Sequence, residues 1–227
     1  MGEEGDATMR TRLGVSLALV GLSMTVFWCV TKAADDGFTP LFNGKDFTGF
    51  GYILADGRKG TDFSTVDTWR IENGTIVCSG KPNGYFYTLK SYRNYHLRFQ
   101  ARFAPTKENP ESVQLNSGYL VHIQGEHKVW PTCVEVQGLN RDMCNIFDIG
   151  GLKGGKYTND AQARKRVRKP LGEWNTIEII SDNGHLTSKL NGTVIGHGTA
   201  PVREGPIGWQ SEGAEIHFRD IAIKLLP

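Results

Sequence analysis

Residues 95–103 read Tyr-His-Leu-Arg-Phe-Gln-Ala-Arg-Phe, and this stretch decides the fold class. Apolar side chains occupy every second position, from Leu97 through Phe99 and Ala101 to Phe103, and polar side chains fill the positions between them. Successive side chains of a strand point to opposite faces of a sheet. The alternation therefore predicts a strand with one buried face and one wetter face.

Similar short runs recur along the chain, and no stretch after residue 34 keeps a helical period over three turns. The further predicted strands span 69–71, 75–78, 119–123, 134–137, 176–180, 186–190, 193–195 and 215–225. Asn-Gly pairs at 73–74, 183–184 and 191–192 lie between successive runs, and Asn-Gly supplies the positive φ angles that a two-residue hairpin turn needs. Many short strands joined by hairpins predict an all-β fold, a two-sheet antiparallel sandwich or jelly roll.

The first 34 residues predict an export segment that is separate from the domain. Arg10 and Arg12 precede an apolar run over residues 13–30, and Ala33 and Ala34 follow it. A charged start, an apolar run and a small-residue exit are typical of a signal peptide, although the run is also long enough for a single membrane anchor. We expect a signal peptide cleaved after Ala33 or Ala34, one domain over 35–227, and a periplasmic or extracellular location.

The net charge and the cysteine count limit which partners the protein can bind and how many disulfides it can form. The net charge of +2 argues against a nucleic-acid partner, which would require a basic excess. The predicted domain contains Cys78, Cys133 and Cys144, so at most one disulfide can form within it. The alternative is that all three cysteines are small buried apolar residues.

Two segments, 51–66 and 138–173, show no clean alternation, and loops of that length in a compact domain are usually functional or disordered. We expect both segments to lie at the rim of the sheet face that binds a ligand. The second segment carries a basic cluster that includes Arg166 and Arg168. This cluster is either a solvated loop face or a lid whose cations meet an anionic group on a substrate.

Three aspartates, Asp142, Asp148 and Asp160, occur in the same long segment. Together with backbone carbonyls they could bind a divalent cation such as Ca²⁺, but they lack the spacing of an EF-hand.

Three polar residues interrupt apolar strands. His122 lies opposite Tyr119 and Val121 by alternation, and Glu135 and Gln137 share one face of the next strand. If these two strands pair, as neighbours in sequence often do, the three polar side chains converge on one surface.

Each of these residues also has a structural alternative. His122 would be a hydrogen-bonded buried histidine. Glu135 would be the partner of Arg98 or Arg102 in a salt bridge, because a carboxylate inside an apolar strand is costly unless it is paired.

Other polar and aromatic residues lie near the ends of the predicted strands. Asn116 precedes the His122 strand, and Gln210 and Glu212 follow Trp209. We expect Asn116, Gln210 and Glu212 to contact a ligand. Trp130 and Trp209 could stack on a sugar ring, although a tryptophan at a strand end is more often part of the core.

Seven short motifs occur in an order that spans almost the whole predicted domain. They are Leu41-Phe42-Asn43-Gly44-Lys45-Asp46, Asn116-Ser117-Gly118, Glu135-Val136-Gln137, Gly172-Glu173-Trp174-Asn175, Asn191-Gly192, Gly205-Pro206-Ile207-Gly208-Trp209-Gln210 and Phe218-Arg219-Asp220-Ile221. In this order the set resembles the 3-keto-disaccharide hydrolase domain, a family of secreted bacterial proteins. The resemblance implies a concanavalin-like jelly roll with a concave binding face. Many members carry a histidine where Glu212 stands, so the chain departs from the family pattern there.

The resemblance also implies a reaction. The substrate would be a 3-keto-glycoside or disaccharide that a separate oxidoreductase has oxidised at C3. The ketone acidifies the C2 proton, so a base can remove it, the glycosidic oxygen leaves, and hydration completes a net hydrolysis. We expect Glu135 or His122 to be the base. Gln137, Asn116, an arginine of the basic cluster or a divalent metal would polarise the ketone.

Two other classes of function remain open. The same fold could be a lectin-like carbohydrate-binding module that holds a glycan through Trp130, Trp209 and amides without turnover. It could also be an adhesion domain of the laminin-G type, which is expected to lack a polar cluster on neighbouring strands. The pair of His122 and Glu135 favours the enzyme.

Overall fold

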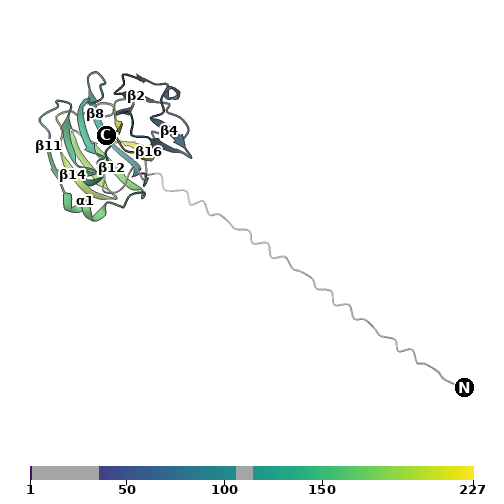
Figure 1. Cartoon of the computed structure of the whole chain (residues 1–227). Helices are drawn as coiled ribbons and strands as arrows, with labels where there is room; N and C mark the ends of the chain where they lie inside the picture. Colours follow the sequence, from purple (N-terminus) through teal and green to yellow (C-terminus); the bar gives the residue numbers. More distant parts are fainter. Residues whose placement is uncertain (2–35, 106–114) are drawn as a thin grey trace. The chain divides into compact units, whose positions relative to one another are not determined.

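The alternating stretch forms strand β7 (Tyr95–Phe103), which lies in the middle of the larger of two antiparallel sheets. The computed structural model describes Met1, residues 36–105 and residues 115–227, and within them this sheet has nine strands (Figure 1). Their order is β11 (Lys156–Asn159), β14 (Thr193–Thr199), β13 (His185–Leu190), β12 (Asn175–Asp182), β7, β16 (Ile216–Leu225), β5 (Thr75–Cys78) and β4 (Trp69–Glu72), and β1 (Thr39–Pro40) pairs with β16.

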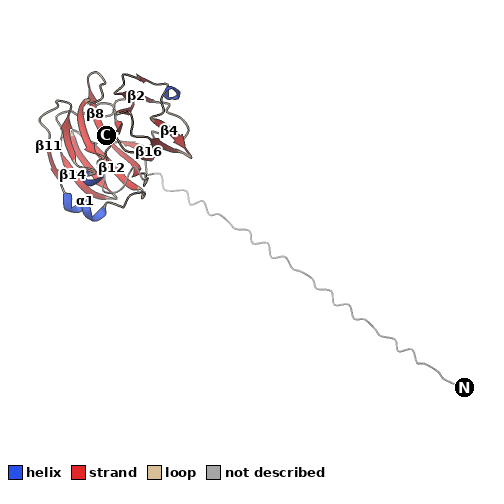
Figure 2. Ribbon diagram, viewed as in Figure 1, coloured by secondary structure: helices blue, strands red, loops and turns tan. Residues whose placement is uncertain are grey.

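The second sheet has seven strands among the described residues. Their order is β10 (Ile146–Ile149), β9 (Thr132–Gln137), β8 (Gly118–Gln124), β15 (Gly208–Ser211), β6 (Gly84–Thr88), β2 (Phe50–Leu54) and β3 (Lys59–Gly60). The helical elements are short: η1 (Phe63–Thr65), η2 (Asn140–Asp142) and α1 (Ala161–Val167) (Figure 2). The structure confirms the prediction of an all-β fold with two antiparallel sheets.

The core lies between the inner faces of the two sheets. Phe99 of β7 meets the edge of Tyr119 from β8, with 4.7 Å between the ring centroids. Trp209 of β15 stacks on Phe86 of β6 at 5.1 Å and is fully buried. Trp209 therefore packs in the core, as a tryptophan at a strand end often does, and cannot stack on a sugar.

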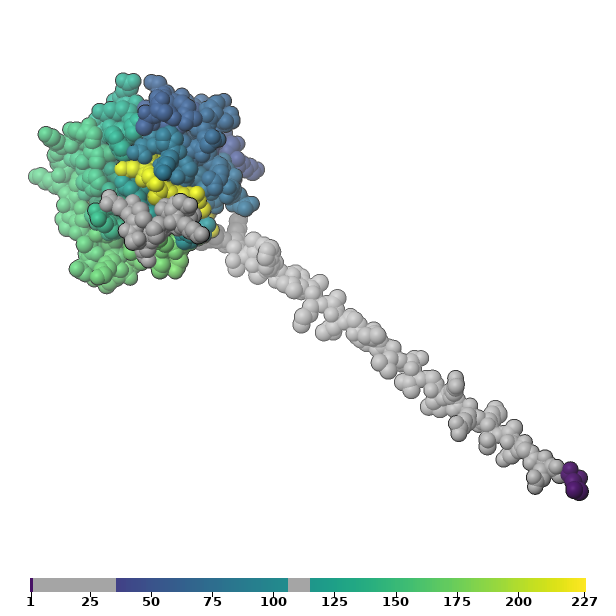
Figure 3. Space-filling view, in the orientation of Figure 1, coloured from purple at the N-terminus to yellow at the C-terminus, as the bar shows by residue number. Residues whose placement is uncertain are grey.

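The three predicted hairpin turns are confirmed. Asn73 and Gly74 join β4 to β5, and both have positive φ angles, 50° and 75°. The pairs at 183–184 and 191–192 join β12 to β13 and β13 to β14 in the same conformation. Strand β16 lies between β7 and β5, so the C-terminal segment pairs with strands that are distant from it in sequence. The C-terminal residues are yellow in Figure 3.

The prediction of two long irregular segments is wrong. Residues 51–66 contain most of β2, with β3 and η1, and residues 138–173 contain η2, β10, β11 and α1. Strand β2 is buried on both faces, so its sequence cannot alternate. Helix α1 has only seven residues, too few to show a period over three turns. Asp160 caps its start by accepting a hydrogen bond from the Ala163 backbone N–H at 2.8 Å.

The predictions for residues 1–34, the signal peptide or membrane anchor, lie outside the described residues apart from Met1. In the part of the chain that the structure describes, no helix is both long and apolar enough to cross a membrane. Cys78, Cys133 and Cys144 are buried with free thiols, which fits their interpretation as small apolar residues.

Candidate functional site

The outer face of the seven-stranded sheet, turned away from the core, carries Glu135. Strand β9 directs Val134 and Val136 into the core, so Glu135 and Gln137 point outward, as the alternation predicted. Leu120 of β8 lies directly opposite Glu135 in the register. Leu120 belongs to a small apolar cluster on this face, separate from the main core.

Glu135 is a buried carboxyl group, and its side chain is part of an apolar surface. The residue is only 6% exposed. Burial raises the pKa of the Glu135 carboxyl from 4.5 to about 8, and the negative charge of the nearby Glu212 adds to the rise. A carboxyl with a pKa in this range can both accept and donate a proton near neutral pH, as acid–base catalysis requires.

The alternative in which Glu135 pairs with a strand arginine is wrong. Both arginines lie on the outer face of the other sheet. Arg98 pairs with Asp36 at 2.7 Å, and the Arg102 guanidinium lies over the Trp174 ring, 4.5 Å from its centroid. No cation therefore neutralises Glu135 among the described residues, and this agrees with its raised pKa.

Gly118 of β8 makes room for the side chains around Glu135. A Cβ atom at position 118 would overlap Oε1 of Glu135 and Oε1 of Gln210, so both oxygens lie over the backbone of this glycine. Gln210 is 1% exposed, and its Oε1 has no hydrogen-bond partner in the described structure. A protonated Glu135 can donate a hydrogen bond to that oxygen.

Asn116 and Glu212 extend this group of side chains. The two residues form an isolated β-bridge. A hydrogen bond from Asn116 lowers the pKa of the Glu212 carboxyl, but burial raises it by more. The Oδ1 atom of Asn116 is buried and has no hydrogen-bond partner in the described structure. We call Glu135, Gln210, Asn116 and Glu212 the acid–amide cluster. Its unpartnered carbonyl oxygens can accept hydrogen bonds from ligand hydroxyls.

Gln137 lies beside this cluster, but its side-chain oxygen already has a backbone partner. It lies opposite Gly118 in the register of β8 and β9. Its Oε1 accepts a hydrogen bond from the Leu139 backbone N–H at 2.7 Å. Its amide N–H groups can still donate to a ligand.

The structure does not bring the three aspartates of the long segment together as a metal site. Asp142 pairs with Arg164, Asp148 accepts from the Tyr157 hydroxyl, and Asp160 caps α1. Among the described residues there is no group of three or more His, Cys, Asp and Glu side chains that could hold a metal.

The prediction that His122 converges with Glu135 on one surface is wrong. The register of β8 and β9 shifts between Val121 and Gln124, and His122 has a φ of 56°. This β-bulge turns the imidazole inward, where its Nδ1 lies 3.1 Å from the Val202 carbonyl oxygen and its Nε2 lies 3.2 Å from Ser181 Oγ of the other sheet. Burial lowers the pKa of His122 to about 4. His122 is thus a structural histidine.

The basic cluster forms part of helix α1 and the turn after it, where the sequence analysis expected a loop. Arg164 is buried and donates to Arg141 O and Asn145 Oδ1. Arg168 donates to Asn140 Oδ1 at 2.9 Å, a contact with η2 rather than with the acid–amide cluster. Arg166 is exposed. Of the two alternatives for this cluster, Arg164 and Arg168 therefore do not fit the lid whose cations are directed at a substrate.

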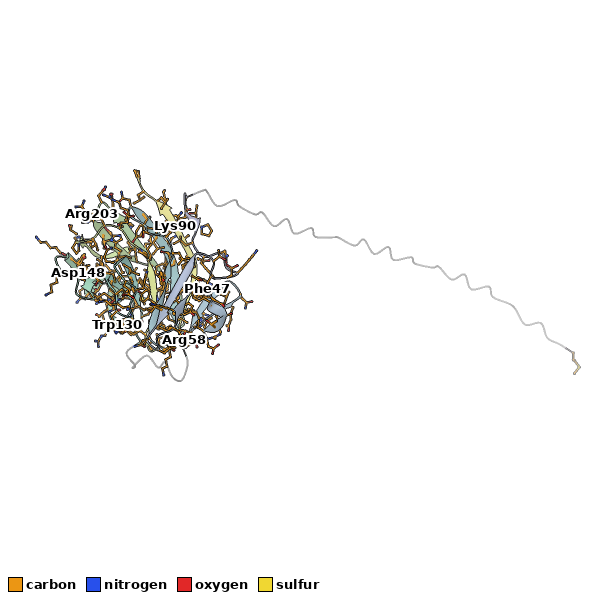
Figure 4. All side chains as sticks on the ribbon, turned by 90° about the horizontal axis from the view of Figure 1, so that it is seen from above. Phe47, Arg58, Lys90, Trp130, Asp148 and Arg203 are labelled. Carbon is orange, nitrogen blue, oxygen red and sulfur yellow. The ribbon has the colours of Figure 1, made fainter. Side chains whose placement is uncertain are left out.

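Trp130 is an exposed aromatic side chain in the loop between β8 and β9. It is 45% exposed and lies at the periphery of the domain (Figure 4). An exposed tryptophan is available to stack on a ligand ring.

The outer face also carries a second polar group that was not predicted from the sequence, formed by His127 and two tyrosines of β6. Tyr85 Oη lies 2.9 Å from Nδ1 of His127, and the Tyr87 ring stacks on the imidazole with 3.8 Å between centroids. Strand β6 reads Gly-Tyr-Phe-Tyr-Thr, and its alternation places both tyrosines opposite the core residue Phe86. That alternation was the available signal.

The family model of the 3-keto-alpha-glucoside-1,2-lyase-like domain matches residues 37–224. This chain belongs to the 3-keto-disaccharide hydrolase domain family. The match covers all but the last residue of the sandwich that carries the acid–amide cluster. Membership supports a carbohydrate-related function, either hydrolysis or binding. No curated protein matches the chain.

Solved structures share the fold at low identity. A protein from Parabacteroides distasonis named as a proposed glycosyl hydrolase is 22% identical, with a TM-score of 0.60 over 84% of this chain and 94% of that chain. A carbohydrate-binding module from Bacillus subtilis has 8% identity and a TM-score of 0.51 over 69% of this chain and 91% of that one. A Bacillus subtilis protein with a galectin-like fold has 12% identity and a TM-score of 0.53 over 83% and 94%. These likenesses show the fold.

Proposed function

We propose that this protein cleaves 3-keto-glycosides, including disaccharides, and that Glu135 is the base that removes the C2 proton. The observation that carries the proposal is the buried Glu135 carboxyl, which has no cationic partner among the described residues and a pKa raised to about 8. Its carboxylate is a stronger base than a solvated one, and its pKa lies close to a neutral working pH.

The reaction follows from the acidity of a proton next to a ketone. The Glu135 carboxylate takes the proton from C2, and the electron pair moves onto the C3 oxygen as an enolate. The enolate then expels the glycosidic oxygen from C1, and a C1–C2 double bond forms. Water adds to C1, Glu135 returns its proton to C2, and the second proton of the water goes to the released alkoxide. The net change is hydrolysis. An ordinary glycosidase would instead need two carboxylates flanking C1.

The amides of the acid–amide cluster suit the rest of a sugar ring. Gln210 Oε1 and Asn116 Oδ1 lack partners, and sugar hydroxyls can donate to both. Buried polar groups that are left unsatisfied are costly, so a ligand that satisfies them gains binding energy. The substrate must already be a ketone at C3, which implies that a separate oxidoreductase acts before this protein. The segment at residues 1–34 is the basis for an exported location, periplasmic or extracellular.

The second candidate function is a carbohydrate-binding module without turnover. The exposed Trp130 and the two unpartnered amide oxygens favour it, because stacking and hydrogen bonding would suffice to hold a glycan. Such a module would bind the oxidised and unoxidised sugars and would release no product from either.

The test compares the wild type with Glu135→Gln on a panel of 3-keto-glycosides and their unoxidised parents. Release of reducing sugar measures turnover, and calorimetry measures binding. We expect turnover of the 3-keto compounds alone, reduced about 100-fold or more in the variant, because glutamine keeps the shape of glutamate and cannot accept the proton. Glu204→Gln, at an exposed position, is the matched control.

Two outcomes would contradict the proposal. A wild-type protein that binds the sugars and cleaves none would be a binding module. A Glu135→Gln variant with full activity would move the base to another residue.

A further inference from the structure

We propose that the Nε2–H of His127 donates a hydrogen bond to the C3 oxygen of the substrate and stabilises the enolate. This inference rests on the proposed cleavage of 3-keto-glycosides and names the electrophilic group that the reaction needs. Arg164, Arg168 and His122 make structural contacts away from Glu135, so none of the three supplies that group.

His127 contacts the same outer face of the sheet that carries Glu135. Tyr85, which binds His127, packs in the apolar cluster of the outer face with Leu120 and Cys133. Leu120 lies opposite Glu135, and Cys133 is two residues before Glu135 on β9. Two residues of a strand span about 7 Å, so Glu135 lies beside the apolar cluster against which Tyr85 holds His127.

The contacts of Tyr85 indicate which nitrogen of His127 carries the proton. The Tyr85 hydroxyl oxygen accepts a hydrogen bond from the Lys128 backbone N–H, which leaves its own O–H free to donate. We infer that this O–H donates to Nδ1 of His127, which lies 2.9 Å from the hydroxyl oxygen. Burial raises the pKa of Tyr85 and lowers the pKa of His127. Tyr85 therefore keeps its proton and the His127 imidazole stays neutral. The single N–H proton of the imidazole then resides on Nε2.

The neighbouring strands are shaped to hold the His127 ring. Tyr87 stacks on the imidazole at 3.8 Å and an interplanar angle of 19°. Tyr87 lies between Gly208 and Gly51 in the register of β15, β6 and β2. A Cβ at Gly51 would lie 2.9 Å from Tyr87 Cζ, and one at Gly208 would lie 3.1 Å from Tyr85 Cδ2. Both tyrosines thus lie close over glycines, which fixes the plane of His127.

A neutral imidazole suits this task. When Glu135 takes the C2 proton, negative charge develops on the C3 oxygen, and a fixed N–H donor stabilises that charge without giving up its proton. No atom is transferred to or from His127 in this step. The charge then moves on to the leaving oxygen as the C1–O1 bond breaks.

The experiment uses His127→Phe, which keeps an aromatic ring for the stack on Tyr87 and removes the N–H. The substrates are the 4-nitrophenyl and the methyl 3-keto-glucosides, one with a good leaving group and one with a poor one. We expect kcat/KM to fall about 100-fold or more on both substrates, and the exchange of the C2 proton in D2O to slow by a similar factor. His197→Phe, at an exposed position, should change neither rate.

The alternatives give different results. A loss confined to the methyl substrate would overturn the proposal, because His127 would then protonate the leaving oxygen. Unchanged rates on both substrates would overturn it while leaving the proposed function intact. A wild type that is inert on both substrates would refute the proposed function and this inference with it.

A second variant keeps the test decisive if His127→Phe does not fold. Tyr85→Phe retains the histidine and removes the hydroxyl that sets its tautomer. Tyr85 is a positioning residue, so we expect a smaller loss in kcat, again equal for the two leaving groups, with KM nearly unchanged. No change in kcat for Tyr85→Phe would overturn the proposed tautomer.

Discussion

Replacing Glu135 by glutamine should make the protein more resistant to high pH. In the fold the Glu135 carboxyl holds its proton up to about pH 8, whereas in an unfolded chain it releases the proton near 4.5. Its contribution to stability is therefore complete below about pH 4.5 and is lost as the pH rises through 8. A difference of about 3.5 in pKa corresponds to at most about 5 kcal/mol.

The measurement is the free energy of unfolding in urea for the wild type, Glu135→Gln and the exposed control Glu204→Gln, at pH 5 and pH 9. Between these pH values the wild type should lose up to about 4 kcal/mol relative to Glu135→Gln, because glutamine cannot ionise. The control should follow the wild type. Parallel pH dependence for the wild type and Glu135→Gln would show that Glu135 is ionised in the fold at neutral pH, which would refute the burial argument.

The remaining predictions concern turnover and binding. Since Glu135 must be ionised to act as a base, kcat/KM on a 3-keto-glycoside should rise as the pH increases and level off above about 8; a profile that is flat from pH 6 to pH 9 would contradict this role. Because Trp130 is 45% exposed, Trp130→Ala should leave the melting temperature unchanged and raise KM about 3- to 10-fold if the ring stacks on the substrate. An unchanged KM would remove Trp130 from the site.

The alternation of apolar and polar residues was sufficient to predict the strands that have one buried face and one solvent-exposed face. Strand β7 alternates at every position because one face meets the core and the other meets solvent. The same rule placed Glu135 outward on β9 and the core residues Val134 and Val136 inward. It failed for β2, which is buried on both faces and therefore has no polar side.

The prediction for His122 failed for a conformational reason. Alternation assumes a regular strand, but a left-handed residue inside a β-bulge reverses the faces from that point on. Nothing in the sequence Val-His-Ile distinguishes a bulge from a regular strand. The register shift became visible only where β8 pairs with β9.

The sequence by itself determined the class of fold, the three hairpins and the outward direction of Glu135, because these depend on a residue and its near neighbours. Tertiary structure alone decided the chemistry of the site. Glu135 acquires its raised pKa from residues brought over it by other strands, and Gln210 reaches it only because Gly118 lacks a side chain. The partnership of Tyr85 with His127 joins residues 42 positions apart. A pKa and a hydrogen bond depend on distances through space, which no local pattern specifies.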